Sequence, residues 1–385
     1  MAQHWARQWI RTWSALLWLA VAPCLIWAPM AHGAETAAGA VKWHPGHYVA
    51  VEKGSRGASD TAKAAYAELD SNPALRGALV RVSWADLEPS KGNYDFHAIE
   101  KQLNEMAAHK KQLVVLLQTK LFGYPNDGPA APDYVLTEPE FEGGVFRFAT
   151  GAGGADGGRE HARVGRRGSN LKLWNTPIYE RLSALMTALG KRFNASPNFE
   201  ALVLQETALS ATDEAITPQQ EDAFFDNLLK LHAQLRASFP NTVTMQLTNY
   251  PVRKLGLLTS RFKAMGTGMG GPDVFLTDPG LNRPNGAYSY YPQLSGAVPL
   301  GVMVAAGNYV ATRHGGPKNE APSVDQLHSF ARDRLKVNYI FWVSSTDHSP
   351  HFPRVLEILN QPELRSDPAG GLSKACPSAF SSCTN

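Results

Sequence analysis

The chain has 385 residues, of which 44% are hydrophobic and 18% are charged. This composition excludes a disordered chain, which would carry fewer apolar residues, and a long coiled coil, which would carry more charged ones. The 37 Lys and Arg residues nearly balance the 34 Asp and Glu residues, for a net charge of +3. Because no block of like charge is present either, a nucleic-acid partner is not expected.

The first 34 residues are typical of a secretory signal peptide. Arg7 and Arg11 precede an apolar run over residues 13–30, and small residues at 31–34 follow as a cleavage site. An uncleaved membrane anchor is the less favoured alternative, because the run is shorter than the ~20 residues of a membrane span. We therefore expect a periplasmic or secreted protein, with no stable membrane insertion after the signal is removed.

Eight short apolar runs follow, and most are continuous rather than alternating, as in strands buried on both faces. Amphipathic segments of helical length lie between many of them. This alternation predicts an α/β fold, a (β/α)8 TIM barrel that forms a single domain over residues 35–365. The expected strands are residues 47–51, 78–84, 113–120, 201–208, 243–249, 274–278, 300–307 and 337–344, and the expected helices are 58–69, 96–109, 176–193, 218–239 and 324–335.

Two segments differ from this pattern. Residues 121–175, after the third run, read as one long irregular loop that should lie over the mouth of the barrel, with a glycine-rich lid segment at 151–158. Residues 366–385 form a C-terminal tail that contains Cys376 and Cys383. In an exported protein we expect a disulfide between these two cysteines, and two free thiols are the alternative.

A specific motif lies in the second strand–helix unit, where many fixed residue types occur at fixed spacing. Its residues are Arg81, Trp84, Glu88, Pro89, Gly92, Tyr94, Asp95 and Phe96. This motif resembles the second unit of clan A glycoside hydrolase barrels, most closely the family 42 and family 5 types. The resemblance continues more weakly through Pro132, Trp174 and the helix at 177–193 to residues 199–209, which are similar to the fourth strand of those enzymes.

The resemblance implies a catalytic role for Glu206. The fourth strand of the resembled enzymes ends in Asn-Glu, whose Glu is the acid/base, and the pair here is Gln205-Glu206. Independently of the resemblance, a carboxylate directly after an apolar run would sit at the carboxyl end of a strand, inside the mouth. A partly desolvated Glu can hold its proton near neutral pH, so Glu206 is the expected general acid. A salt bridge or a helix cap is the alternative, and Glu88 is expected to be a structural turn residue.

Cleavage of a glycosidic bond also needs a second group on the other side of the sugar. The resembled enzymes carry a nucleophilic Glu at the end of the seventh strand, but residues 299–308 contain no carboxylate. Two replacements are open: Asp278 after the sixth run and Asp347 after the eighth. We favour Asp278, because two steps around the barrel from the fourth strand would suit a wide gap. A turn or helix N-cap role for Asp278 is the alternative.

The remaining site residues are expected sugar contacts. The resemblance implies that Arg81 binds the second catalytic group and that Trp342 is the aromatic platform for the sugar, with a structural ion pair and core packing as the alternatives. Further expected contacts at the ends of runs are Trp84, Gln118, Lys120, Gln205, Asn249, Tyr250, Asn308 and Asp347. No metal or cofactor is expected, because the His44/His47 and His348/His351 pairs lack metal-binding spacing.

The sequence thus predicts an exported glycoside hydrolase-like protein that cleaves O-glycosidic bonds in a polysaccharide or oligosaccharide by carboxylate acid/base catalysis. The alternative is a catalytically inactive barrel that binds carbohydrate in polysaccharide export or cell-surface assembly. Glu206 favours the enzyme, and the absence of a carboxylate in residues 299–308 favours the binding protein.

Overall fold

The computed structural model describes residues 39–51, 66–123, 128–149, 167–317, 320–344 and 351–385, which belong to one compact unit, Glu35–Asn385. The expected signal peptide, the expected lid segment at 151–158 and Asp347 lie outside the described residues. Within these ranges, no helix is both long enough and apolar enough to cross a membrane.

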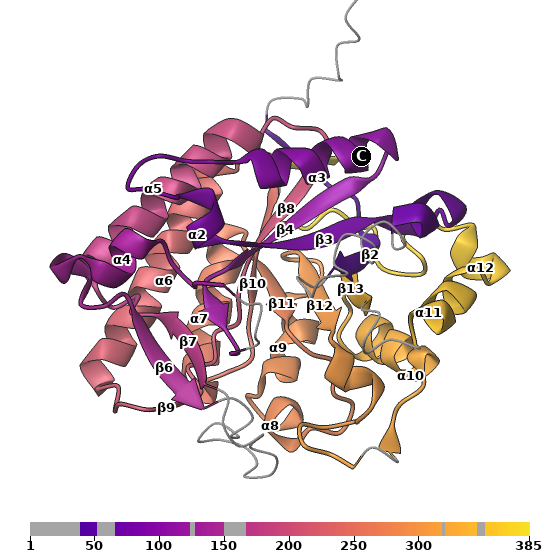
Figure 1. Ribbon diagram of the computed structural model, residues 1–385. Helices are drawn as coiled ribbons and strands as arrows, with labels where there is room; N and C mark the ends of the chain where they lie inside the picture. Colours follow the sequence, from indigo (N-terminus) through magenta and orange to yellow (C-terminus); the bar gives the residue numbers. More distant parts are fainter. Residues whose placement is uncertain (1–38, 52–65, 124–127, 150–166, 318–319, 345–350) are drawn as a thin grey trace, which may run out of the picture. The chain divides into compact units, whose positions relative to one another are not determined.

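Eight parallel strands close into a barrel, with β13 pairing back onto β2 (Figure 1). Helices surround the barrel, so the expected (β/α)8 fold is confirmed. In order around the barrel the strands are β2 (Gly46–Val51), β3 (Leu75–Ser83), β4 (Gln112–Gln118), β8 (Phe199–Leu204), β10 (Val243–Leu247), β11 (Gly268–Gly271), β12 (Leu300–Val304) and β13 (Tyr339–Ser344).

The strands read as continuous apolar runs because both of their faces are buried. Along β4, Val114 and Leu116 belong to the cluster inside the barrel, whereas Leu113, Val115 and Leu117 belong to the layer between the barrel and the helices. Successive side chains of a strand point to opposite faces, so a strand between two apolar layers needs apolar residues at every position.

The helices begin where the local sequence supplies caps. Asn175 accepts a hydrogen bond from the backbone of Ile178 at the start of α5, and Thr217 forms a reciprocal capping box with Gln220 at the start of α6. The longer helices are α3 (His97–Ala108), α5 (Thr176–Phe193), α6 (Pro218–Ser238), α7 (Val252–Met265), α9 (Ala287–Leu294), α10 (Val324–Ser329, followed by a π-helical turn at Phe330–Arg334) and α11 (Phe352–Leu359). The shorter ones are α2 (Trp84–Leu87), α4 (Asp133–Thr137), α8 (Pro279–Asn282) and α12 (Pro362–Arg365).

The expected sixth strand at 274–278 is wrong, because the strand is β11, six residues earlier. Its sequence, GMGG, has a single apolar side chain. A Cβ on Gly270 would lie 2.7 Å from Leu247 Cδ2 and 2.9 Å from Met245 Sδ, so neighbouring side chains already fill the space inside the barrel. Because side chains of a neighbouring strand fill the barrel interior beside β11, the sequence of β11 has no hydrophobic pattern of its own.

The segment expected as one irregular loop contains ordered structure. Strands β5 (Lys120–Leu121), β7 (Arg167–Leu171), β6 (Val145–Ala149) and β9 (Ala211–Thr212) form an antiparallel sheet in that order. We call it the mouth sheet, because β5 follows β4 after one residue and β9 lies in the connection after β8. In Figure 1 its labelled strands lie at the opposite end of the barrel from the C-terminus.

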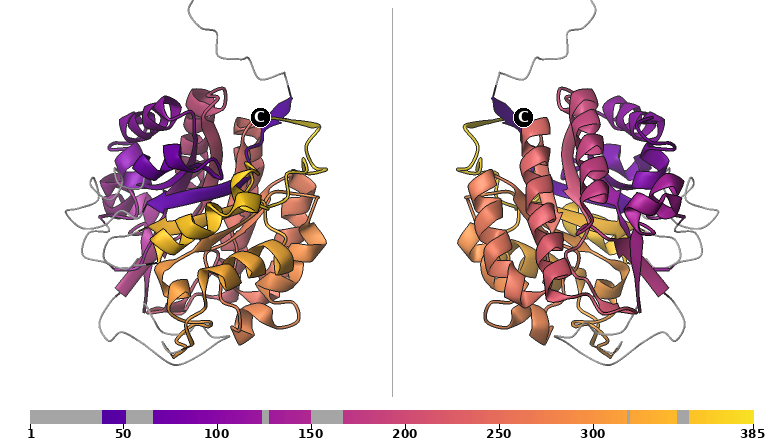
Figure 2. Two further views of the ribbon diagram at one scale, coloured as in Figure 1. Left: turned by 90° about the vertical axis from the view of Figure 1, so that its right-hand side faces the viewer. Right: turned by 90° about the vertical axis from the view of Figure 1, so that its left-hand side faces the viewer.

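The C-terminal tail packs at the amino ends of the barrel strands. Strand β14 (Ser382–Thr384) pairs in parallel with β1 (Ala40–Lys42), and Cys376 and Cys383 form a disulfide. Phe380 and Trp43 join the apolar cluster inside the barrel, which the tail therefore closes at this end (Figure 2). The tail is thus part of the barrel's packing.

Candidate active site

Three polar residues occupy the same position relative to three neighbouring strands. Glu206, Asn249 and Asp273 each lie two residues after the last residue of β8, β10 and β11. The carboxyl ends of parallel barrel strands all meet at one mouth, where barrel enzymes place their catalytic groups. The mouth therefore presents a carboxylate, an amide and a second carboxylate along adjacent strands.

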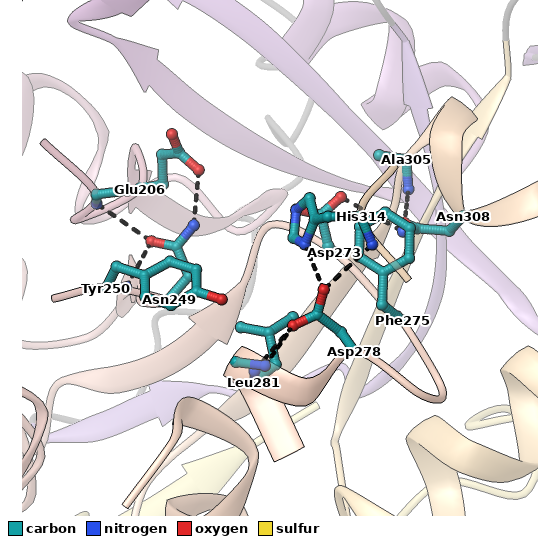
Figure 3. A network of polar contacts seen from close by, with 12 residues as sticks. Glu206, Asn249, Tyr250, Asp273, Phe275, Asp278, Leu281, Ala305, Asn308 and His314 are labelled. Carbon is teal, nitrogen blue, oxygen red and sulfur yellow. Dashed lines mark hydrogen bonds and ion pairs between the residues drawn. The ribbon is translucent and has the colours of Figure 1, made fainter. Parts of the chain in front are cut away.

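Glu206 is bound on both of its carboxylate oxygens, and Figure 3 shows the contact with Asn249. Lys120 Nζ donates to Oε1 at 2.5 Å, and Asn249 Nδ2 donates to Oε2 at 2.8 Å. The Glu206 side chain is 12% exposed, so it lies at the edge of the protein interior with access to solvent. An ammonium and an amide both donate to this side chain, so its contacts suit a carboxylate anion.

Lys120 is a buried cation that is surrounded by hydrogen-bond acceptors. Its side chain is 1% exposed, and Nζ also donates to the Ala208 carbonyl at 2.6 Å and to Ser210 Oγ at 3.2 Å. The ammonium lies 4.7 Å from the centre of the Phe148 ring. Burying an ammonium is costly unless it is paired, so Glu206 is the counterion that allows Lys120 to be buried. Lys120 is thus the partner of the Glu206 carboxylate and is itself enclosed, so it does not suit the expected direct contact with a ligand.

Gln205 and Gln118 differ in how their side chains are used. Gln205 Oε1 accepts the backbone N–H groups of Thr119 and Lys120, which fixes the chain where β4 leads into the mouth sheet. Gln118, the last residue of β4, has a buried Oε1 with no hydrogen-bond partner among the described residues. Buried acceptors are rarely left unpaired, so this oxygen is a candidate ligand contact.

Asn249 and Tyr250 connect Glu206 to the next part of the mouth. Asn249 Oδ1 accepts the backbone N–H groups of Ala208 and Tyr250, so the amide that donates to Glu206 is locked in orientation. Tyr250 is partly exposed. A Cβ on Gly280 would collide with its hydroxyl, so the Tyr250 ring reaches the first turn of α8.

Asp278 is the N-cap of α8, and this arrangement does not suit the expected second catalytic carboxylate. Its Oδ1 accepts the N–H groups of Gly280 and Leu281, both at 3.0 Å. Its Oδ2 accepts the backbone N–H of His314 at 3.1 Å and His314 Nδ1–H at 2.8 Å. Burial opposes the charge, but the hydrogen bonds from His314 and the backbone prevail and lower the pKa of Asp278. With four N–H donors, Asp278 is engaged as a positioning group.

Asp273 and His314 were missed by the sequence analysis. Asp273 lies beside His314, with 3.6 Å between Asp273 Oδ2 and His314 Nε2, and it receives Asn308 Nδ2 at 3.4 Å. Partial burial disfavours the charge of His314, but the hydrogen bond to Asp278 and the charge attraction of Asp273 and Asp278 outweigh it and raise the pKa of His314 to about 10. Placing the sixth strand at Gly268–Gly271 would have put Asp273 at its end.

Both expected tryptophan contacts are fully enclosed, which corrects those expectations. Trp342 lies on the outer face of β13, where its Nε1–H donates to His47 Nδ1 at 2.9 Å, because Phe341 and Val343 take the inner positions. Trp84 begins α2 and donates from Nε1 to Glu88 Oε2 at 2.8 Å. Neither ring has a face open to a sugar. Glu88 is buried in this turn, as expected for a structural residue.

Arg81 and Asn308 are the remaining expected contacts. Arg81, on β3, is partly exposed and places Nη2 3.3 Å from Met303 Sδ of β12, so its side chain reaches across the top of the barrel interior. Asn308 is fully buried, and its Oδ1 accepts the backbone N–H of Ala305 at 2.7 Å. Asn308 therefore lies behind Asp273 and does not reach a sugar.

A pocket adjoins Glu206 on the helix side of the barrel. It lies between β8 and the helices α5 and α6, and most of its lining is apolar, including Leu182, Phe224 and Leu228. Gln205 and Glu206 also line this pocket, so Glu206 lies between the pocket and the polar mouth, where Asn249, Asp273 and His314 lie.

No protein-family model matches the chain, and no curated protein matches it in sequence. The catalytic domain of beta-amylase from Paenibacillus polymyxa has a TM-score of 0.53 and 9% identity, with 83% of this chain and 98% of that domain covered. Endo-glycoceramidase II from Rhodococcus sp. has a TM-score of 0.49 and 13% identity, with 84% and 80% covered. A family 39 glycoside hydrolase from Bacteroides cellulosilyticus WH2 has a TM-score of 0.45 and 10% identity, with 78% and 56% covered. The likeness to the beta-amylase domain shows that the two chains share a barrel fold.

Proposed function

We propose that this protein is an exported glycoside hydrolase that cleaves O-glycosidic bonds in a polysaccharide or oligosaccharide, with Glu206 as a catalytic carboxylate. The observation that carries the proposal is the environment of Glu206. This carboxylate lies two residues past the fourth barrel strand, is partly exposed, and is fixed by a buried ammonium and a locked amide. A carboxylate held in this way at a barrel mouth is preorganised for proton transfer.

The surroundings of the mouth support a carbohydrate as the ligand. Gln118 has an amide oxygen without a hydrogen-bond partner among the described residues, Arg81 places its guanidinium at the top of the barrel, and Tyr250 has a partly exposed ring. Amide and guanidinium groups bind sugar hydroxyls, and aromatic rings suit the apolar faces of pyranoses. Asp347 remains a proposed contact on the basis of its place after the eighth strand.

The test is release of reducing ends from a panel of bacterial and plant polysaccharides. The full-length chain is expressed in a bacterial host, so that any processing of residues 1–34 takes place. We expect turnover by the wild type and a loss of about 10²–10⁴-fold in Glu206→Gln, the usual contribution of a group that transfers a proton. His109→Gln is the matched control, because His109 pairs with Asp70 beyond the end of α3, far from the mouth in the fold.

A carbohydrate-binding barrel without catalysis is the second candidate. It is favoured by Asp278, whose four N–H donors occupy both oxygens, and by residues 299–308, which supply no carboxylate after the seventh strand. In that case the wild type and Glu206→Gln bind the same glycan with equal affinity, and neither releases reducing ends. A role in polysaccharide export or cell-surface assembly would follow from binding alone.

A further inference from the structure

Loops from the sixth and seventh strands meet at one histidine. His314 follows β12 in the seventh loop, and Asp273 and Asp278 follow β11 in the sixth. Figure 3 shows this group on one side and Glu206 with Asn249 and Tyr250 on the other. The seventh strand lies three strands from the fourth around the barrel, so its loop faces the fourth strand across the mouth.

One nitrogen of His314 is fixed and the other is available. Asp278 Oδ2 accepts both the backbone N–H and the Nδ1–H of His314, so one hydrogen bond orients the ring and the other fixes the backbone beside it. The ring also packs against Phe275, with 4.3 Å between ring centres. Nε2 is 3.6 Å from Asp273 Oδ2, which is too long for a full hydrogen bond. The side chain is 47% exposed, so an acceptor from a ligand can reach Nε2.

We infer that His314 is the proton donor of the site, oriented by Asp278, and that Glu206 is the proton acceptor opposite it. The inference rests on the proposed function and assigns the two roles by the contacts of each group. Glu206 lies against an ammonium and an amide, which suit a carboxylate anion. His314 lies against two carboxylates, which suit an imidazolium. The contacts of each group therefore suit the role assigned to it.

The hydrolysis that these roles describe is balanced. A water oxygen attacks the anomeric carbon while Glu206 takes one proton of that water, using a lone pair that Lys120 and Asn249 leave free. The bond between the anomeric carbon and the leaving oxygen breaks, its electron pair stays on that oxygen, and the oxygen receives the Nε2 proton of His314. Transfer of one proton through solvent from Glu206 to His314 restores the starting state.

The charged groups that face His314 determine how its protonation depends on pH. Among the described residues these are Asp273 and Asp278, both from the sixth loop. They keep the imidazolium protonated well above neutral pH, with a pKa of about 10. The activity should therefore persist into alkaline solution and fall as the pH rises through about 10.

The experiment compares two leaving groups in the full-length protein. Once the polysaccharide panel identifies the sugar, hydrolysis of that glycan is compared with hydrolysis of its 2,4-dinitrophenyl glycoside, whose leaving group needs no proton. We expect His314→Gln to lose about 10²–10⁴-fold on the glycan and far less on the aryl glycoside, because only the former needs a general acid. Glu206→Gln should lose both activities, and His109→Gln should lose neither.

A second readout does not depend on turnover. In protein labelled with ¹⁵N-histidine, the His314 ring should titrate near pH 10 and move toward 6.5 in Asp278→Asn. A His314 pKa near 6.5 in the wild type would overturn the role of His314 as a proton donor held by Asp278.

The outcomes separate the inference from the proposed function. Full glycan hydrolysis by His314→Gln would overturn the inference while the proposed function stands. Equal losses on both substrates would overturn it too, because they indicate a structural role. Absence of turnover by the wild type on every glycan would overturn the proposed function and the donor role together.

Discussion

Replacement of Lys120 by methionine tests the ion pair on which the site depends. Lys120→Met keeps most of the side-chain volume but removes the ammonium that contacts Glu206, the Ala208 carbonyl and Ser210. Breaking a buried ion pair by removing one partner typically costs about 3–5 kcal/mol, because the other charge is left uncompensated. Glu206 is 12% exposed and keeps its bond from Asn249, so we expect the lower end, about 3 kcal/mol of unfolding free energy.

The double variant separates the pair from the individual side chains. In Lys120→Met/Glu206→Gln no charge is left unpaired, and the combined cost should be smaller than that of Lys120→Met alone, with a coupling of about 2 kcal/mol. The assay is urea denaturation of the wild type, both single variants and the double variant. Additive effects, or a cost below about 1 kcal/mol for Lys120→Met, would refute the ion-pair account.

Three further predictions concern stability. Burial lowers the pKa of His47 to about 3 and that of His232 to about 4, so both side chains are neutral in the folded protein at neutral pH. The unfolding free energy should therefore fall as the pH drops below about 6.5, by up to about 1.4 kcal/mol per pH unit for each histidine. An unfolding free energy from urea denaturation that stays constant from pH 7 to about 4.5 would contradict this. Gly270→Ala should cost about 1–3 kcal/mol of unfolding free energy, because its Cβ would clash with Leu247 and Met245. Gly256→Ala in α7 should be close to neutral, because the nearest atom to its Cβ would be Tyr290 Oη at 3.3 Å. Equal melting temperatures for the two variants would be inconsistent with a filled barrel interior. Asp278→Ala should lower the unfolding free energy by about 1–2 kcal/mol, because α8 loses its N-cap. It should also lower the pKa of His314, and an unchanged His314 titration by NMR would argue against the contact between Asp278 and His314.

The sequence predicted the barrel well because most of its strands are made of Val, Leu and aromatic residues buried on two faces. It failed at β11, where glycines leave room for Met245 and Leu247 and no hydrophobic pattern remains. That one misplacement moved the expected second carboxylate from the end of the strand to Asp278, a helix cap. The expected role of Trp342 failed for a related reason. A one-residue difference along a strand reverses the face to which a side chain points, and Trp342 points outward from β13.

Parts of the site had no local signal in the sequence. Lys120 and Glu206 are 86 residues apart, and β6 and β7 of the mouth sheet lie within residues 121–175, which were expected to be irregular. His314 lies ten residues past the end of β12, in a loop whose path is set by tertiary contacts to Asp278. Neither pairing follows from spacing or periodicity, since both depend on how distant loops pack at the mouth.

The most direct test of the central claim is the release of reducing ends from the polysaccharide panel by the wild type, Glu206→Gln and His109→Gln. Our account predicts turnover of at least one glycan by the wild type and His109→Gln, and a loss of about 10²–10⁴-fold in Glu206→Gln with glycan binding retained. Turnover that survives in Glu206→Gln, or glycan binding without turnover in all three proteins, would contradict a catalytic role for Glu206.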